Sequence, residues 1–123
     1  MKIVATIEAR MNSSRLPGKV LMDIGGIKSL ECQIQRLKKS NFINDIVIAT
    51  TKNSEDDELV KFAKYNNVKV YRGSENDVMK RILGASKSVN ADLQVQTTGD
   101  CPLIDSQIVD SVIETFLESD GRY

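Results

Sequence analysis

The sequence predicts an α/β fold with a doubly wound, mostly parallel sheet, formed by a single domain over residues 1–123. Short apolar runs alternate along the chain with stretches in which apolar residues recur at helical spacing. A chain of 123 residues is long enough for one compact domain and too short for two. Hydrophobic residues make up 41% and charged residues 28%, so we expect an ordinary packed core.

Four short apolar runs are typical of buried strands: Ile3–Ile7, Ile46–Ala49, Val68–Tyr71 and Leu93–Thr97. Helical stretches separate them, which indicates βαβ units with right-handed crossovers and parallel strands. We expect the spatial order 3-2-1-4, with the order of strands reversing between the first and the fourth. Ligands of open α/β sheets bind beyond the carboxyl ends of the strands at such a switch point. The segments expected there are 9–19 and 98–105.

The helices are predicted from apolar stripes that follow each strand. The stripes are Ile27, Leu30, Ile34 and Leu37; Leu59, Val60 and Ala63; Val78, Ile82, Ala85 and Val89; and Ile108, Val109, Val112, Ile113 and Phe116. Ser54, Ser74 and either Asp105 or Ser106 are suitable capping residues before the last three. The acidic run Glu55–Glu58 is expected in the first turn of the second helix, where carboxylates favourably meet the positive end of the helix dipole.

Composition excludes several classes of function. The chain has no histidine, which removes Ser-His-Asp, Cys-His and histidine-ligated zinc mechanisms. Lys plus Arg and Asp plus Glu both number 17, so the basic excess expected of a nucleic-acid or membrane-surface protein is absent. No apolar run approaches the roughly 20 residues of a membrane span, and no long apolar leader follows Lys2. We expect a cytoplasmic protein that binds neither nucleic acid nor membrane.

The loop after the first strand carries the chemistry of polyphosphate binding. Its candidate residues are Arg10, Ser13, Ser14, Arg15 and Lys19. The cations can form charge-assisted hydrogen bonds to phosphate, and the hydroxyls and turn amides can donate further ones. The Leu16-Pro17-Gly18 turn allows a positive φ at the glycine. Composition alone leaves open a solvated basic loop.

A second candidate segment, Thr98–Asp105, follows the fourth strand. Asp100 stands where a carboxylate can hold Mg²⁺ against phosphate oxygens, because Mg²⁺ takes one or two carboxylates and completes its shell with phosphate and water. The alternative for Asp100 is a turn residue beside glycine and proline. Asp105 is better explained as a helix N-cap.

Together the two segments resemble one family, the cytidylyltransferases that make CMP-activated sugars. Ala9–Leu21 resembles their N-terminal signature, and Thr98–Asp105 is similar to their metal-binding motif. Val47–Thr51 and Tyr71–Val78 also match. The most similar subgroup is the spore-coat polysaccharide biosynthesis type, related to the acylneuraminate and 3-deoxy-manno-octulosonate cytidylyltransferases. The resemblance covers essentially the whole chain and implies a truncated Rossmann-like sheet of the nucleotide-diphospho-sugar transferase type.

The resemblance implies a reaction and a role for each matching residue. A sugar hydroxyl would attack the α-phosphorus of CTP, releasing pyrophosphate and leaving a CMP-sugar. Arg15 and Lys19 would hold the triphosphate and the leaving pyrophosphate, and Arg10 and Ser14 would help to close the loop. Asp100 would coordinate Mg²⁺.

Base binding is implied over the ends of the first and fourth strands. The base would touch the backbone of Ala9 and the side chain of Gln96 or Thr98. Arg72 and Arg81 are further candidates for substrate or phosphate contacts, with a surface helix position as the alternative for Arg81. The partners are therefore CTP and a sugar acceptor, with acidic sugars among the candidates.

Departures from the family pattern leave alternatives open. Asn12 and Gln96 stand where relatives commonly have glycine and arginine. Family members run to about twice this length, so the chain is expected to be the nucleotide-binding half. The alternatives are a nucleotide-binding remnant without turnover and a doubly wound signalling module. Such a module needs a paired acidic cluster after the first strand, where this chain has only Glu8. A truncated sheet exposes an edge and apolar helix faces, so we also expect self-association into a homo-oligomer.

Overall fold

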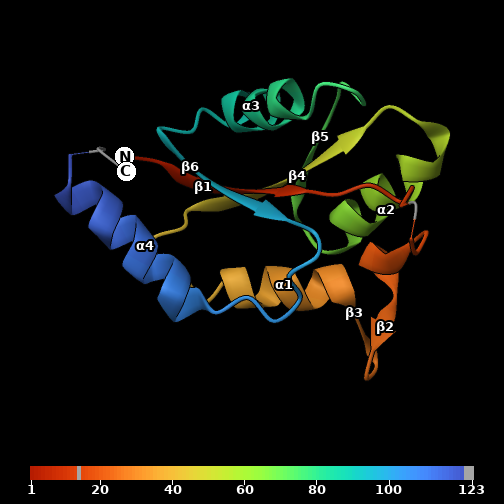
Figure 1. Cartoon of the computed structure of the whole chain (residues 1–123), viewed down its shortest axis with the longest axis horizontal. Coiled ribbons are helices and arrows are strands. Elements are labelled where there is room, and N and C mark those ends of the chain that lie inside the picture. The colour runs from red at the N-terminus through yellow and green to blue at the C-terminus, as the bar shows by residue number, and fades with distance from the viewer. Residues whose placement is uncertain (14, 121–123) are drawn as a thin grey trace.

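The computed structural model describes residues 1–13 and 15–120. Its main sheet has four parallel strands, β1 (Ile3–Glu8), β4 (Asp45–Thr51), β5 (Lys69–Gly73) and β6 (Leu93–Thr98). Their spatial order is β5-β4-β1-β6 (Figure 1). The predicted order 3-2-1-4 is thereby confirmed, and the switch point lies between β1 and β6.

Helices cover both faces of this sheet. They are α1 (Ser29–Leu37), α2 (Asp57–Tyr65), α3 (Val78–Ser88) and α4 (Ser106–Glu118). In Figure 1, α3 lies on one face, and α1, α2 and α4 lie on the other. The doubly wound α/β architecture is confirmed. Among the described residues, no helix is both long and apolar enough to cross a bilayer.

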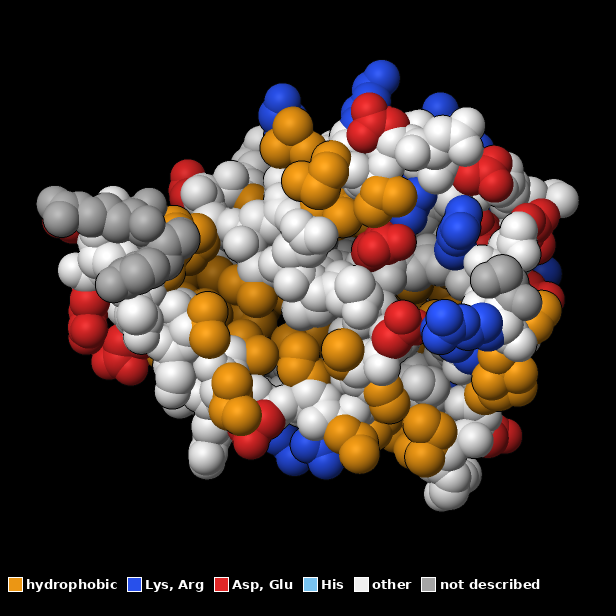
Figure 2. Space-filling view, in the orientation of Figure 1, with side chains coloured by type: hydrophobic (Ala, Val, Ile, Leu, Met, Phe, Trp, Pro, Cys, Tyr) orange, Lys and Arg blue, Asp and Glu red, His pale blue; other side chains and the backbone are white. Residues whose placement is uncertain are grey.

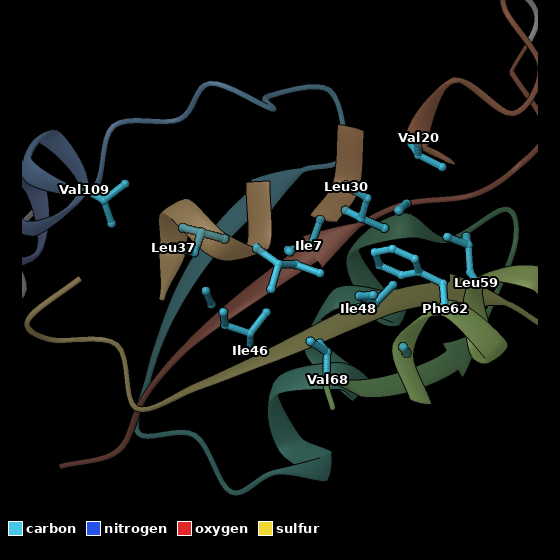
Figure 3. Close-up of a cluster of buried hydrophobic side chains, with 14 of the residues drawn as sticks. Ile7, Val20, Leu30, Leu37, Ile46, Ile48, Leu59, Phe62, Val68 and Val109 are labelled. Atoms are coloured by element: carbon cyan, nitrogen blue, oxygen red, sulfur yellow. The ribbon is translucent and has the colours of Figure 1, made fainter. Parts of the chain in front are cut away.

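Alternating side chains of β1 divide the core into two layers, as the two-residue period of a strand requires. Ile3, Ala5 and Ile7 pack on the face of α1, α2 and α4, whereas Val4 packs beneath α3. The larger layer, drawn in Figure 3, brings Leu30 and Leu37 of α1 onto residues of β1 and β4. Packing of both faces explains why these strands are nearly continuous apolar runs.

One predicted element differs from the structure. Ile27 was expected on the first helix, but it lies in a short antiparallel hairpin formed by β2 (Asp23–Ile24) and β3 (Ile27–Lys28). Gly25 and Gly26, with φ of 62° and 96°, form the two-residue turn. A positive φ at both central residues matches the twist of a hairpin. The helix begins two residues later, at Ser29.

The predicted helix starts are correct for α4 and shifted for α2 and α3. The carboxylate of Asp105 accepts hydrogen bonds from the amides of Gln107 and Ile108 at 2.8 and 3.4 Å, so it is the N-cap of α4. The cap of α3 is Asp77 rather than Ser74, and it accepts from the amide of Lys80 at 3.0 Å. Ser54 begins a 3₁₀ turn, η2 (Ser54–Asp56), and α2 follows it.

Candidate functional site

The two candidate segments leave the sheet side by side. Glu8 at the end of β1 pairs in register with Thr98 at the end of β6. The amide of Gly99 donates to the carbonyl of Glu8 at 2.8 Å, and the amide of Ala9 donates to the carbonyl of Ala49 in β4 at 3.1 Å. Both segments therefore start from fixed backbone at the switch point.

Gly99 allows the two segments to approach closely. A Cβ at this position would lie 3.1 Å from Cγ1 of Val20, 3.2 Å from Cβ of Ala9 and 3.3 Å from the carbonyl oxygen of Glu8. These distances are tighter than ordinary van der Waals contact. A larger residue here would press one loop against the other, so glycine lets the two segments pack at this distance.

The loop from Ala9 to Lys19 closes on itself at Met11 and Gly18. The amide of Gly18 donates to the carbonyl of Met11 at 2.8 Å. Gly18 has a φ of 76°, as the predicted Pro-Gly turn requires, and it leads into the 3₁₀ turn η1 (Lys19–Leu21). The Ser13 hydroxyl accepts from the amide of Leu16 at 3.4 Å.

A cavity of about 220 Å³ lies between the two segments. It is lined by Glu8, Ala9, Arg10, Asn12, Ser13, Lys19, Val20, Thr98, Gly99 and Asp100. Six of the predicted site residues are in this lining: Ala9, Arg10, Ser13, Lys19, Thr98 and Asp100. The structure therefore brings together residues from both ends of the sequence at the predicted place.

An ion pair spans the cavity. Nζ of Lys19 lies 3.0 Å from Oδ1 of Asp100, and both side chains are more than one-third exposed. The pair joins the residue proposed for phosphate to the residue proposed for the metal ion. Because exposed pairs contribute little to stability, both groups can exchange this contact for a ligand at small cost.

Arg15 and Gln96 lie elsewhere. Arg15 is exposed on the loop, and Gln96 lies two residues before Thr98 on the edge strand β6. Gln96 lines a separate groove of about 550 Å³ between β6 and α4. Ser14 is outside the described residues. The roles of these three residues, like those of the six that line the cavity, remain predictions.

The donor set suits a cation that is shared with a ligand. Within residues 1–13 and 15–120, no cluster of three or more His, Cys, Asp or Glu side chains could hold a metal ion by itself. Asp100 offers an exposed carboxylate at the edge of the cavity, next to a cation-lined loop. One carboxylate fits Mg²⁺, which takes its other ligands from phosphate and water.

Sequence reasoning missed a residue that fixes the loop from Ala9 to Lys19. Asp56 was expected in the first turn of a helix, and only 1% of its surface is accessible. Its carboxylate accepts from the amide of Met11 at 2.7 Å and from the hydroxyl of Thr51. Its place in a first helical turn was predicted, but the inward direction of its carboxylate from η2 could not be read from a run of four acidic residues.

Gln33 supports the other segment. It is fully buried in α1 and donates through Nε2 to the carbonyl of Thr98 at 2.8 Å. The signal was present in the sequence, because a polar residue stands among the apolar positions of the first helical stripe. A buried amide of this kind needs a hydrogen-bond partner, and here the partner is the end of β6.

The arginines expected near the substrate have structural partners. Arg81 is buried rather than on the surface, and it lies 3.3 Å from the carboxylate of Glu8 and 2.9 Å from the carbonyl of Ser74. Arg72 donates to the carbonyl of Thr51 at 2.7 Å and to Asp57 at 2.7 Å. Arg81 joins the end of β1 to the segment that follows β5, and Arg72 joins β5 to the end of β4 and to α2.

Comparison with known proteins identifies the family of this chain. The sequence signature of the family described as cytidylyltransferase matches residues 4–123. The chain belongs to the cytidylyltransferase family. The solved structure of a cytidylyltransferase from Leptospira borgpetersenii superposes with a TM-score of 0.92 at 46% identity, over 99% of this chain and 51% of that chain.

Two further similar proteins have names that refer to sugar chemistry. The spore coat polysaccharide biosynthesis protein SpsF of Bacillus subtilis is 33% identical over 98% of this chain and 52% of its own length. A CMP:2-keto-3-deoxy-manno-octonic acid synthetase, solved in complex with CTP, has a TM-score of 0.79 at 26% identity, over 96% of this chain and 48% of its own. This cytidylyltransferase-family chain thus spans about half the length of these relatives.

Proposed function

We propose that this chain is the nucleotide-binding half of a cytidylyltransferase that binds CTP with Mg²⁺ and transfers CMP to a sugar. The observation that carries the proposal is the cavity at the switch point, where Arg10, Ser13, Lys19 and Asp100 come together from two distant segments. At about 220 Å³ it is smaller than the ~300–1,000 Å³ of typical ligand pockets. We therefore assign it to the triphosphate, with the base and ribose extending over the ends of β1 and β6.

Each group has one task in this proposal. Lys19 and Arg15 neutralise the triphosphate and then the leaving pyrophosphate, and Arg10, Ser13 and Ser14 close the loop around it. Ala9 meets the base through its backbone, while Thr98 and Gln96 offer side-chain contacts. Asp100 releases Lys19 and holds Mg²⁺, which when bound lowers the charge repulsion against an incoming nucleophile.

The proposed reaction exchanges one phosphorus–oxygen bond for another. The sugar hydroxyl oxygen forms a bond to the α-phosphorus while the bond from that phosphorus to the oxygen bridging the β-phosphorus breaks. Pyrophosphate leaves with the electron pair, and the hydroxyl proton passes to solvent. The acceptor sugar, acidic sugars among the candidates, and the cytoplasmic location predicted from the sequence are parts of the same proposal.

Calorimetry of CTP binding tests the nucleotide assignment. We expect binding that requires Mg²⁺ and weakens about tenfold or more in Arg15→Ala and Lys19→Ala, because each variant removes a charge-assisted contact to phosphate. Lys87→Ala is a matched control, since Lys87 is exposed in the last turn of α3, far from the carboxyl ends of the strands. Absence of CTP affinity in the presence of Mg²⁺ contradicts the proposal.

A second candidate function is nucleotide binding without turnover. The observation that favours it is the length of the chain, about half that of its relatives. An assay of pyrophosphate release with CTP and candidate acidic sugars separates the two functions. Robust release by this chain excludes the binding-only alternative, whereas CTP binding without release supports it. The family match lends no support to the signalling module.

A further inference from the structure

The loop from Ala9 to Lys19, which the proposed function assigns to the triphosphate, is supported by a carboxylate in another part of the chain. That carboxylate belongs to Asp56. Asp56 ends the 3₁₀ turn η2 between β4 and α2, and its accessible surface is 1%. Burial of a carboxylate is unfavourable unless hydrogen bonds replace the lost water. Breaking the hydrogen bonds of Asp56 would therefore leave its carboxylate buried without partners, which is unfavourable.

Both oxygens of this carboxylate have partners. Oδ1 accepts from the amide of Met11 at 2.7 Å, and Oδ2 accepts from the hydroxyl of Thr51. The Thr51 oxygen in turn accepts from the amide of Asn53 at 3.1 Å. Within the described part of the chain, no lysine or arginine forms an ion pair with Asp56. The contacts to Met11 and Thr51 are thus the hydrogen bonds that replace water at this carboxylate.

Met11 is the point at which the loop is fixed. Its amide binds Asp56, while its carbonyl accepts from the amide of Gly18 at 2.8 Å. Its neighbours on either side, Arg10 and Asn12, both line the cavity. The orientation of the Met11 backbone therefore determines where the groups around it point.

We infer that Asp56 is a positioning residue for nucleotide binding, acting through the Met11 amide. It touches no substrate in this role. By holding one peptide group, it keeps Arg10 and Ser13 directed at the cavity before the nucleotide arrives, so less ordering is required on binding. This inference rests on the proposed function.

Amide hydrogen exchange, followed by NMR, tests the contact in the unaltered chain. We expect the Met11 amide to exchange about tenfold or more slowly than that of exposed Asn12, because it donates to a buried acceptor. Equal exchange of the two amides overturns the inference without any substitution.

Three variants test the consequence for binding. Asp56→Ala removes the acceptor, so we expect fast exchange at Met11 and CTP–Mg²⁺ affinity lower by about tenfold or more. Asp56→Asn keeps an oxygen for the Met11 amide, and we expect affinity within about threefold of the parent chain. Asp57→Ala is the matched control: it removes the same charge from the next residue, which pairs with Arg72 at 2.7 Å, and should leave CTP affinity within about twofold.

The outcomes separate the inference from the proposed function. Loss of affinity and fast Met11 exchange in Asp56→Ala, with recovery of both in Asp56→Asn and no loss of affinity in Asp57→Ala, support a positioning role. Equal loss in Asp57→Ala, or unchanged affinity in Asp56→Ala, overturns it. If the Met11 amide of the unaltered chain exchanges slowly but the chain does not bind CTP, the proposed function is contradicted. The contact between Asp56 and the loop is supported in that case. If Asp56→Ala does not fold, Met11 amide exchange and CTP–Mg²⁺ affinity in Asp56→Asn test the inference instead.

Discussion

At the residue scale, the ion pair between buried Arg81 and partly exposed Glu8 links the cavity to the core. The Arg81 side chain is fully buried, and it contacts Glu8 at 3.3 Å and the carbonyl of Ser74 at 2.9 Å. We expect Arg81→Leu to lower the free energy of unfolding by about 3 kcal/mol, because it leaves the Glu8 carboxylate and the Ser74 carbonyl without these contacts. Urea denaturation measures this. Lys80→Ala, an exposed change of the same charge, should cost less than about 0.5 kcal/mol.

Asp45 makes stability depend on pH. Burial alone would raise the pKa of its carboxyl, but hydrogen bonds from Lys69 and from the amide of Ile46, with the charges of Lys69 and Lys2, lower it overall below 3.8. A lowered folded-state pKa stabilises the chain above the unfolded value and loses this contribution as pH falls through the folded value. We expect Asp45→Asn to cost about 1 kcal/mol or less at pH 7 and nothing in strong acid. Thermal melts from pH 7 to strong acid, comparing the melting temperatures of the parent chain and Asp45→Asn, check this expectation. Asp23→Asn, at an exposed position, is the control.

At the element scale, the contact between the two loops depends on Gly99. A methyl group there would press on Val20, Ala9 and the carbonyl of Glu8 at 3.1–3.3 Å. We expect Gly99→Ala to destabilise the chain by about 1–3 kcal/mol and to weaken CTP binding by separating the loops. Val20→Ala removes the nearest atom, so the double variant should be more stable than the sum of the two single effects predicts. Additive effects would contradict a steric origin.

Sequence patterns predicted the strands and most helices, because apolar periodicity reports directly on burial. They missed the hairpin at residues 23–28, where two positive φ angles at Gly25 and Gly26 decide the local structure. Gly-Gly is a known hairpin signal, but Ile27 also fitted the helical stripe. Asp56 could not have been found in this way, since the direction of one carboxylate within an acidic run depends on the 3₁₀ turn that carries it.

At the scale of the whole molecule, one edge of the sheet is open. Beyond β6 there is no further strand among the described residues. A groove of about 550 Å³ lies between β6 and α4, lined mostly by apolar side chains, and Figure 2 shows hydrophobic side chains gathered in a hollow there. The edge strand carries no lysine or proline, the residues that commonly prevent edge-to-edge pairing.

We therefore keep self-association as a prediction and assign it to this face. Ile108 and Val112 on α4 are 64% and 63% exposed, so Ile108→Lys with Val112→Glu should reduce association without unfolding the chain. Sedimentation velocity over a range of concentrations measures this. Leu83→Lys, at a 50% exposed position of α3 on the opposite face, is the control. A chain that stays monomeric at high concentration contradicts the prediction.

The sequence by itself predicted the fold class, the strand order and the two segments that line the cavity at the switch point. It could do so because strand and helix periods follow from local patterns of burial, and because alternating strands and helices restrict the topology of a parallel sheet. Only the tertiary structure decided which groups support that site: Asp56 beneath Met11, Gln33 beneath Thr98 and Arg81 beside Glu8. Each of these contacts joins residues distant in sequence through one directional hydrogen bond or ion pair, and such a bond exists only once the backbone on both sides has been placed.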